Sequence, residues 1–305
     1  MMRYLGRRAW HSVVALCALV MLVFFLVRLT GDPANLYLPI DASVAQREAF
    51  SQRHGFDRPV LEQFASFVGD LLSGDLGVSI RKERPALEVV LQAFPTTLSL
   101  AAITMTLALL LAVAVGSLAA YRPGGIFDRS ATLSSLAAAS APDFWVAITG
   151  ILVFAVALGW LPTSGTGGWP FWVMPIAVLM LRPFGLLVQV VRGAMLDALS
   201  SGYVKTARAK GVAESAVVFV HALRNSSLAV VTVAGDQMVG IINGAVIVET
   251  VFGWPGVGKL MIDAVMQRDF ALVQATILVT ASAIFLLNML IDVIYVALDP
   301  RIRHQ

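Results

Sequence analysis

The chain has 305 residues, of which 58% are hydrophobic and only 13% are charged, and its formal net charge is +3. Its mean hydropathy of +0.81 is well above that of ordinary soluble domains. These values exclude a soluble globular protein, and the small net charge gives no indication of nucleic-acid binding. The composition predicts an all-α membrane protein that crosses the lipid bilayer several times. Its single cysteine, Cys17, excludes an intrachain disulfide.

The first predicted element is an N-terminal transmembrane helix within residues 1–30. Three arginines precede an apolar run from about Ala9 to Leu29, which is long enough to cross a bilayer. A signal peptide is the alternative, but its apolar region is shorter and ends in a cleavage site of small residues. We therefore expect an uncleaved span whose amino end lies in the cytoplasm.

Residues 31–94 differ from the first span in that they are mixed in charge and contain four prolines. They include short amphipathic stretches, such as Val60–Leu72. The segment is too polar to span a membrane, and it is long for a loop without structure of its own. We expect a small folded extracytoplasmic region between the first and second spans.

Residues 95–298 form the predicted core of five further spans, and residues 299–305 form a cytoplasmic tail. The apolar segments run approximately over Pro95–Ala120, Ala131–Leu158, Trp172–Met195, Ser226–Glu249 and Ala271–Leu298. Six spans that start inside place most lysines and arginines of the short connecting segments on the cytoplasmic side, as the positive-inside rule requires. Both chain ends are therefore expected in the cytoplasm.

The polar and basic segment Gly202–Asn225 lies between two of the predicted spans. Its charged groups are too costly to place in the hydrocarbon core of a bilayer. Its sequence pattern predicts one or two short helices. It is either a plain connecting loop or a docking surface for a protein on the cytoplasmic side. We favour docking.

Two charged residues, Arg182 and Asp236, fall near the middle of predicted spans. Charged side chains at that depth are costly and commonly functional. We predict that they pair with each other or flank a water-filled path for a substrate; a structural ion pair, or an Arg182 that reaches the interface, is the alternative. Gln237 and Asn243 continue along the same span and are included in the predicted path.

The segment Gly253–Lys259 has the spacing of a phosphate-binding P-loop. The next residue is Leu260 rather than the Ser or Thr that ligates magnesium, and the segment follows a membrane helix rather than a strand. A turn with Trp254 at the lipid interface is the favoured interpretation. A gating role of this turn is a further hypothesis, and it would involve Glu249, Trp254, Pro255 and Gly256.

No catalytic or metal-binding pattern is evident. The four histidines are scattered without the paired spacing of a metal site, and no nucleophile motif or acid pair stands out. We therefore expect a non-catalytic transport protein that binds no metal or cofactor of its own. An ion-coupled secondary transporter is the second hypothesis, but it predicts inverted repeats, and no convincing internal repeat is visible.

The stretch Lys205–Gly211, KTARAKG, with Leu223 after it, resembles the cytoplasmic loop of ABC importer permeases. Further blocks resemble the dipeptide/oligopeptide/nickel branch of that family, nearly from end to end. They are RLTGDPA at 28–34, GDLG at 74–77, FPTTL at 94–98, HALRN at 221–225, ETVFGWPGVG at 249–258 and DPRIR at 299–303.

The resemblance implies a type I ABC importer permease fold in a bacterial inner membrane. It implies four kinds of partner: a second related permease, two ATPase subunits that bind ATP and Mg, an extracytoplasmic solute-binding protein, and membrane lipid. The loop at about 201–225 would couple this chain to the ATPases through Lys205, Thr206, Ala207, Arg208, Ala209, Lys210 and Gly211. Peptides are the expected substrate, with glutathione or nickel chelates as alternatives.

Overall fold

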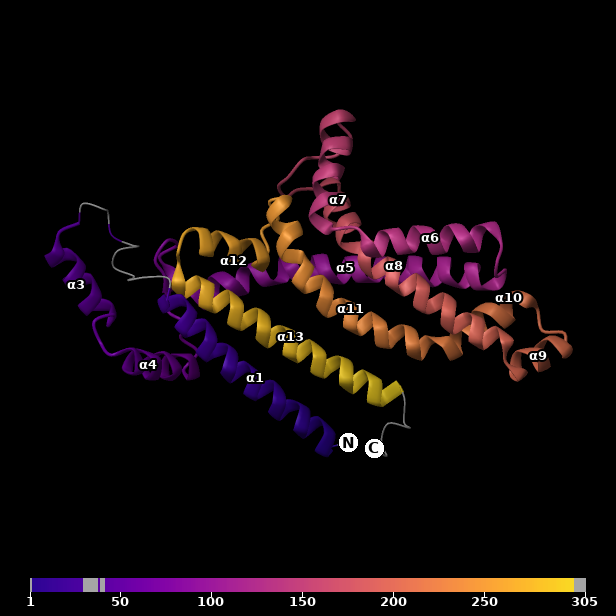
Figure 1. Cartoon of the computed structure of the whole chain (residues 1–305), viewed down its shortest axis with the longest axis horizontal. Helices are drawn as coiled ribbons and strands as arrows, with labels where there is room; N and C mark the ends of the chain where they lie inside the picture. The colour runs from indigo at the N-terminus through magenta and orange to yellow at the C-terminus, as the bar shows by residue number, and fades with distance from the viewer. Residues whose placement is uncertain (1, 30–37, 39–41, 299–305) are drawn as a thin grey trace. The chain divides into compact units, whose positions relative to one another are not determined.

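Helices form nearly all of the secondary structure in the computed structural model, which describes residues 2–29, 38 and 42–298 (Figure 1). The predicted tail at 299–305 and the beginning of the region 31–94 lie outside the described residues. In chain order the elements are α1 Met2–Leu29, α3 Val44–His54, α4 Val60–Leu72, β1 Val78–Ser79, β2 Arg84–Pro85, α5 Ala86–Tyr121, α6 Ile126–Ser140, α7 Asp143–Gly150, η1 Ile151–Ala157, α8 Pro170–Ser200, α9 Gly202–Ala209, α10 Glu214–Ala216, η2 Val217–Ala222, α11 Leu223–Val251, α12 Val257–Met266 and α13 Phe270–Leu298. The two η elements are π-helices.

Four stretches of the described chain are long and apolar enough to cross a membrane: α5, α8, the helical run Glu214–Val251, and Phe270–Ile294 of α13. The apolar part of α1, Trp10–Leu26, is shorter. Together with one bent helix pair, the described residues give at most five spans by length and composition. The mostly helical architecture with several apolar spans is confirmed, whereas the predicted total of six stays a prediction.

The predicted span Ala131–Leu158 is not one helix. It consists of α6 and the run Asp143–Ala157, which are bent by 100° at the break between them. Ala141 is extended, with φ −71° and ψ 131°, because the ring of a following proline disfavours the helical conformation at the residue before it. Pro142 thus ends the helix here, whereas Pro183 lies inside the continuous helix α8.

Two helix starts also differ from the sequence prediction. α5 begins at Ala86 and continues through Pro95, so the predicted start at Pro95 is too late. The run that contains α11 begins at Glu214 rather than near Ser226. Its first turns are helical because Val217, Val218 and Ala222 are buried, the last two in a core cluster with Val191 and Met195 of α8. The prediction had assigned these turns to the polar segment.

The chain divides into two compact units, which we describe separately. Unit 1 comprises Thr96–Lys259 and the described residues from Leu287 on; unit 2 comprises Met2–Pro95 and Leu260–Leu286. In unit 1, α8 packs against α6 and α11 (Figure 1). Gly185 permits the close approach to α6, because a Cβ there would lie 2.3 Å from the backbone oxygen of Ser135.

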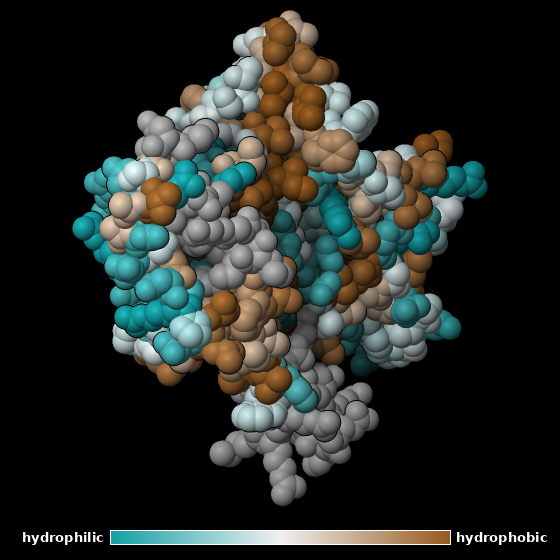
Figure 2. Space-filling view, turned by 60° about the vertical axis from the view of Figure 1, so that its left-hand side comes forward, coloured by the Kyte–Doolittle hydropathy of each residue, from teal (hydrophilic) through white to brown (hydrophobic). Residues whose placement is uncertain are grey.

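Unit 1 contains a partly buried ion pair and an exposed apolar surface. Arg192 of α8 donates two hydrogen bonds to the buried carboxylate of Asp128 on α6, which joins these helices. By contrast, α7 and η1 expose large apolar side chains, including Trp145 at 59% and Val156 at 65%. Figure 2 shows this as hydrophobic surface at the top of the view. Such a surface is typical of contact with lipid or with another apolar helix.

Unit 2 contains a cluster of aromatic rings and a buried acid. Phe24 of α1 is fully buried and lies 5.1 Å from the ring of Phe64 on α4, the helix formed by the predicted amphipathic stretch. The strands β1 and β2 form an antiparallel pair. Asp269 is fully buried; it accepts a hydrogen bond of 2.5 Å from the Ser79 hydroxyl and one of 3.2 Å from the Leu272 amide, which caps α13.

Candidate functional site

The predicted coupling segment folds as a short exposed helix. α9 is held by the buried side chain of Val204, while Lys205, Thr206, Lys210 and most of its other residues are exposed. α9 ends at Ala209, and Gly211 follows with a φ of +76°, which residues that carry a Cβ rarely adopt. The amides of Gly211 and Val212 turn back onto carbonyl oxygens within the helix. Gly211 therefore lies in the turn that separates α9 from the next helix.

An ion pair holds α9 to the start of the next helix. Arg208 donates hydrogen bonds of 3.1 and 2.5 Å to the two carboxylate oxygens of Glu214. This hydrogen bonding raises the pKa of Arg208 above its ordinary value. The result is a compact helix–turn–helix corner that presents a basic outer surface.

A cavity of about 500 Å³ lies in unit 1 between α7, α8 and α11. It is lined by all four residues of the predicted path, Arg182, Asp236, Gln237 and Asn243. The Gln237 amide donates a hydrogen bond of 3.2 Å to the Asp236 carboxylate. In the described part of the chain, Arg182 and Asp236 form no ion pair with each other. The two charges thus share one cavity without direct pairing.

The same cavity contains a third charged residue, Asp143, which the sequence analysis missed. It is the first residue of α7, directly after the break at Pro142, and its carboxylate is attracted by the charge of Arg182. The signal was present in the sequence, because Asp143 falls inside the predicted span Ala131–Leu158. The rule that singled out Arg182 and Asp236 would have included it.

Glu249, a residue of the predicted gating turn, has a different environment. Its side chain is fully buried, and one oxygen accepts a hydrogen bond of 2.6 Å from the Thr97 hydroxyl. Its other oxygen accepts hydrogen bonds from the amides of Gly258 and Lys259, at 2.7 and 3.1 Å. These amides belong to the first turn of α12, where a carboxylate is favourable. Glu249 therefore joins α5, α11 and α12.

The segment that resembles a P-loop offers these amides to the chain's own carboxylate. In a phosphate-binding loop such donors would cradle a phosphate, whereas here Glu249 occupies the corresponding place. Gly256 is required by this packing, because a Cβ on it would lie 2.1 Å from a Glu249 oxygen. The turn is therefore built around the two acceptor oxygens of the Glu249 side chain.

The position of Trp254 corrects the sequence interpretation. Its side chain is only 2% exposed, so it does not lie at a lipid interface. Its ring packs edge-on against Trp172 of α8, with the ring centroids 4.6 Å apart. Phe252 and Val248 belong to the same core cluster. A gating role of the turn stays a prediction.

The chain is similar to known proteins over its whole length. A family model described as "Binding-protein-dependent transport system inner membrane component" matches residues 112–304, and a model of the N-terminal part of such components matches residues 1–101. A glutathione transport system permease protein of Escherichia coli is 36% identical over 306 residues. An oligopeptide transport system permease protein of Bacillus subtilis and a di/tripeptide transport system permease protein of Pseudomonas aeruginosa are each 35% identical, over 316 and 341 residues. Each of these comparisons covers 100% of both chains.

One solved structure is also similar, the crystal structure of an amino acid ABC transporter with histidines. It has a TM-score of 0.53 and 14% identity, and the match covers 70% of this chain and 94% of that chain. At this identity the similarity concerns the fold alone.

Proposed function

The chain belongs to the family of binding-protein-dependent transport system inner membrane components, and on this premise we propose that it forms half of the pathway of an ABC importer for peptides. The relatives described above are named for glutathione, oligopeptides and di- or tripeptides. Glutathione is itself a small peptide with free carboxylates and an ammonium group. Short peptides with free termini are therefore the proposed substrate, and glutathione is the second candidate.

The observation that carries the proposal is the cavity that contains Arg182, Asp143 and Asp236. Arg182 and Asp236 are exposed on the surface of this chain, although both lie within helices long and apolar enough to span the membrane. A charge at the centre of a bilayer costs about 2.5 to 3.5 kcal/mol on insertion scales. A face with several such groups is therefore suited to a water-filled path or a partner subunit rather than to lipid.

The chemistry of the cavity suits a peptide. A guanidinium group such as Arg182 binds a carboxylate through paired hydrogen bonds. The carboxylates of Asp143 and Asp236 suit an ammonium group, and the amides of Gln237 and Asn243 can donate to and accept from peptide groups. A free peptide carries all three kinds of group, so the cavity complements both of its ends.

Coupling to ATP is proposed to occur through α9. Its exposed basic surface and its rigid corner at Gly211 suit a helix that is seated in a partner and transmits displacement to α8 and α11. Such a lever would drive the change between outward- and inward-facing states. ATP and Mg would be bound by the two partner ATPase subunits, and this chain would carry out no chemistry itself.

The proposed assembly further contains a second related permease and an extracytoplasmic solute-binding protein. We place the chain in the bacterial inner membrane with six spans, counting α1 as the first. Both chain ends and α9 would then lie in the cytoplasm, and residues 31–94 outside it. Chemical labelling that reaches Lys205 and Lys210 only from outside would contradict this arrangement.

The experiment that tests the function is ATP-driven uptake of a dipeptide into proteoliposomes that contain the complete importer. We expect Arg182→Gln and Asp236→Asn each to lower uptake roughly tenfold, equivalent to about 1.4 kcal/mol, because each removes a charged hydrogen-bonding group from the path. If both residues act on one substrate, the double variant should lose less than the sum of the two effects.

Asp197→Asn is the matched control, because Asp197 is an exposed acid of α8 that does not line the cavity. It should transport at the wild-type rate. Unchanged uptake in both cavity variants would contradict the proposed path. Uptake by the chain alone, without ATPase subunits, would contradict the proposed class of transporter.

A further inference from the structure

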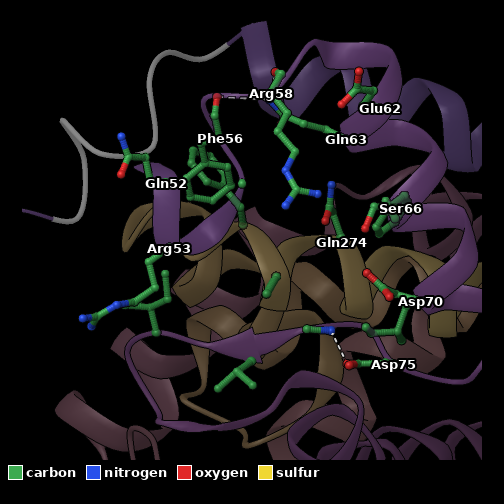
Figure 3. A pocket seen from close by; sticks show the side chains of 18 residues that line it. Gln52, Arg53, Phe56, Arg58, Glu62, Gln63, Ser66, Asp70, Asp75 and Gln274 are labelled. Carbon is green, nitrogen blue, oxygen red and sulfur yellow. Dashed lines mark hydrogen bonds between the residues drawn. The ribbon is translucent and has the colours of Figure 1, made fainter. Parts of the chain in front are cut away.

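Unit 2 contains a second cavity, of about 600 Å³, which the proposed pathway does not use. Its walls come from the end of α3 and the loop to α4, one face of α4, the segment Asp75–Ile80, and the first turns of α13. Figure 3 shows this pocket from close by. A volume of this size lies within the range of small-molecule sites.

One polar group in the pocket is buried without a partner. Gln274 of α13 is only 6% exposed, and its Nε2 has no hydrogen-bond partner in the described structure. A buried donor left without an acceptor is destabilising and uncommon in folded proteins. An acceptor oxygen supplied by a ligand would satisfy it.

The side chains of Gln63 and Asp75 have partners and build the walls of the pocket. The Gln63 amide donates hydrogen bonds to the backbone oxygens of Phe56 and Arg58, at 3.2 and 2.9 Å. The Asp75 carboxylate accepts a hydrogen bond of 2.8 Å from the Gly77 amide, drawn as a dashed line in Figure 3. These contacts hold the loop before α4 and the turn before β1 in place.

Arg58 and Asp70 are charged residues of the pocket wall that are available to a ligand. The side chains of Arg58 and Asp70 form no hydrogen bond or ion pair with any described residue. Figure 3 shows Arg58 and Gln274 extending into the same part of the pocket, with Asp70 on its wall. The pocket thus presents a cation, an unpaired amide donor and a separate carboxylate, beside the apolar side chains of Phe67 and Leu76.

We propose that this pocket binds a small zwitterionic peptide, with its carboxylate held by Arg58 and the Gln274 amide and its ammonium group by Asp70. A carboxylate would supply the acceptor that Gln274 lacks, and a guanidinium beside an amide is a favourable carboxylate site. The apolar wall would receive a side chain of the peptide. The identification of the ligand as a peptide rests on the proposed function; the site itself is distinct from the cavity at Arg182 and Asp236.

The test is equilibrium binding of radiolabelled alanyl-phenylalanine to the importer complex in lipid nanodiscs, without ATP and without the solute-binding protein. We expect Arg58→Gln and Gln274→Leu each to weaken binding at least tenfold. Asp70→Asn should weaken binding of the free dipeptide but not of its N-acetyl form, which lacks the ammonium group. The dipeptide amide, which lacks the carboxylate, should not compete.

Arg81→Gln and Gln267→Leu are the matched controls, because both residues are exposed in unit 2 and neither lines the pocket. They should bind as the wild type does. Gln274→Leu should melt no lower than the wild type without ligand, because it removes an unpaired buried donor. Arg58 is exposed, so Arg58→Gln tests the site without disturbing the interior.

Two outcomes would overturn the inference. One is the absence of dipeptide binding to the wild-type complex. The other is binding that Arg182→Gln abolishes while Arg58→Gln and Gln274→Leu leave it unchanged, since that ligand would lie in the other cavity. In either case, ATP-driven uptake that depends on Arg182 would leave the proposed function standing, so the two failures are distinguishable.

Discussion

Glu249 and Asp236 are acidic residues of the same helix, α11, but their surroundings differ in every respect. Glu249 is fully buried, and its carboxylate accepts hydrogen bonds from Thr97, Gly258 and Lys259. Asp236 is exposed in a cavity, where its hydrogen-bond donor is the neighbouring Gln237. A charge within a membrane helix can therefore either organise the fold or be left available for a ligand.

The two sites differ in the source of the hydrogen-bond donors to the carboxylate. At Glu249 the chain itself supplies the donors, so the carboxylate takes the place that a phosphate would have in a P-loop. At Asp236 most donors must come from water, a substrate or a partner subunit. We expect substitutions at the first site to affect stability and those at the second to affect transport.

The largest effect on stability is expected for Glu249→Ala. Removing the carboxylate leaves the Thr97 hydroxyl and two amides of α12 without their acceptor in the protein interior. We expect a loss of about 3 kcal/mol in the free energy of unfolding, since each unsatisfied buried group costs about 1 to 3 kcal/mol. Denaturant unfolding in detergent, followed by tryptophan fluorescence, measures it. A loss smaller than that of Glu249→Gln, which keeps one acceptor, would contradict this role.

A smaller loss is expected for Gly256→Ala, which tests the same cluster from the other side. Its Cβ would lie 2.1 Å from a Glu249 oxygen, and that side chain cannot move away without breaking its hydrogen bonds. Overpacking of this kind costs about 1 to 3 kcal/mol. The matched control is Gly240→Ala in α11, where a Cβ meets nothing within 4 Å. That change should raise stability by about 0.5 to 1 kcal/mol.

The smallest effect on stability is expected for Asp236→Asn. Because Asp236 is exposed and forms no ion pair in the described structure, the free energy of unfolding should change by no more than about 0.5 kcal/mol. The same unfolding measurement applies, alongside the uptake assay. A destabilisation as large as that of Glu249→Ala would show that both acids serve the fold and would remove the contrast between them.

Much of the architecture could be predicted because it depends on local properties. Runs of apolar residues marked α5, α8, α11 and α13, and the polar, basic pattern of Gly202–Asn225 indicated the short helix α9. The charged residues Arg182 and Asp236 could be singled out by their position in apolar segments alone. Their common cavity could not, because it depends on how α7, α8 and α11 pack.

The errors have physical reasons too. Pro142 and Pro183 look alike in the sequence, but one separates two helices bent by 100° and the other lies within α8. In membrane proteins, neighbouring helices decide whether the backbone groups freed by a proline are satisfied. The residues after Glu214 read as part of a polar segment, yet their apolar side chains pack into a core cluster with α8 and continue the helix.

By itself, the sequence of this protein determined which segments are apolar enough for a membrane, where a basic helix interrupts them, and which family the chain resembles. These properties follow from the composition of short stretches. Only the tertiary structure decided which charges are internal and which are available. Thr97, one of the hydrogen-bond partners of Glu249, is 152 residues away in the chain, and Ser79 is 190 residues away from Asp269. Contacts over such separations arise from packing, which no local pattern encodes.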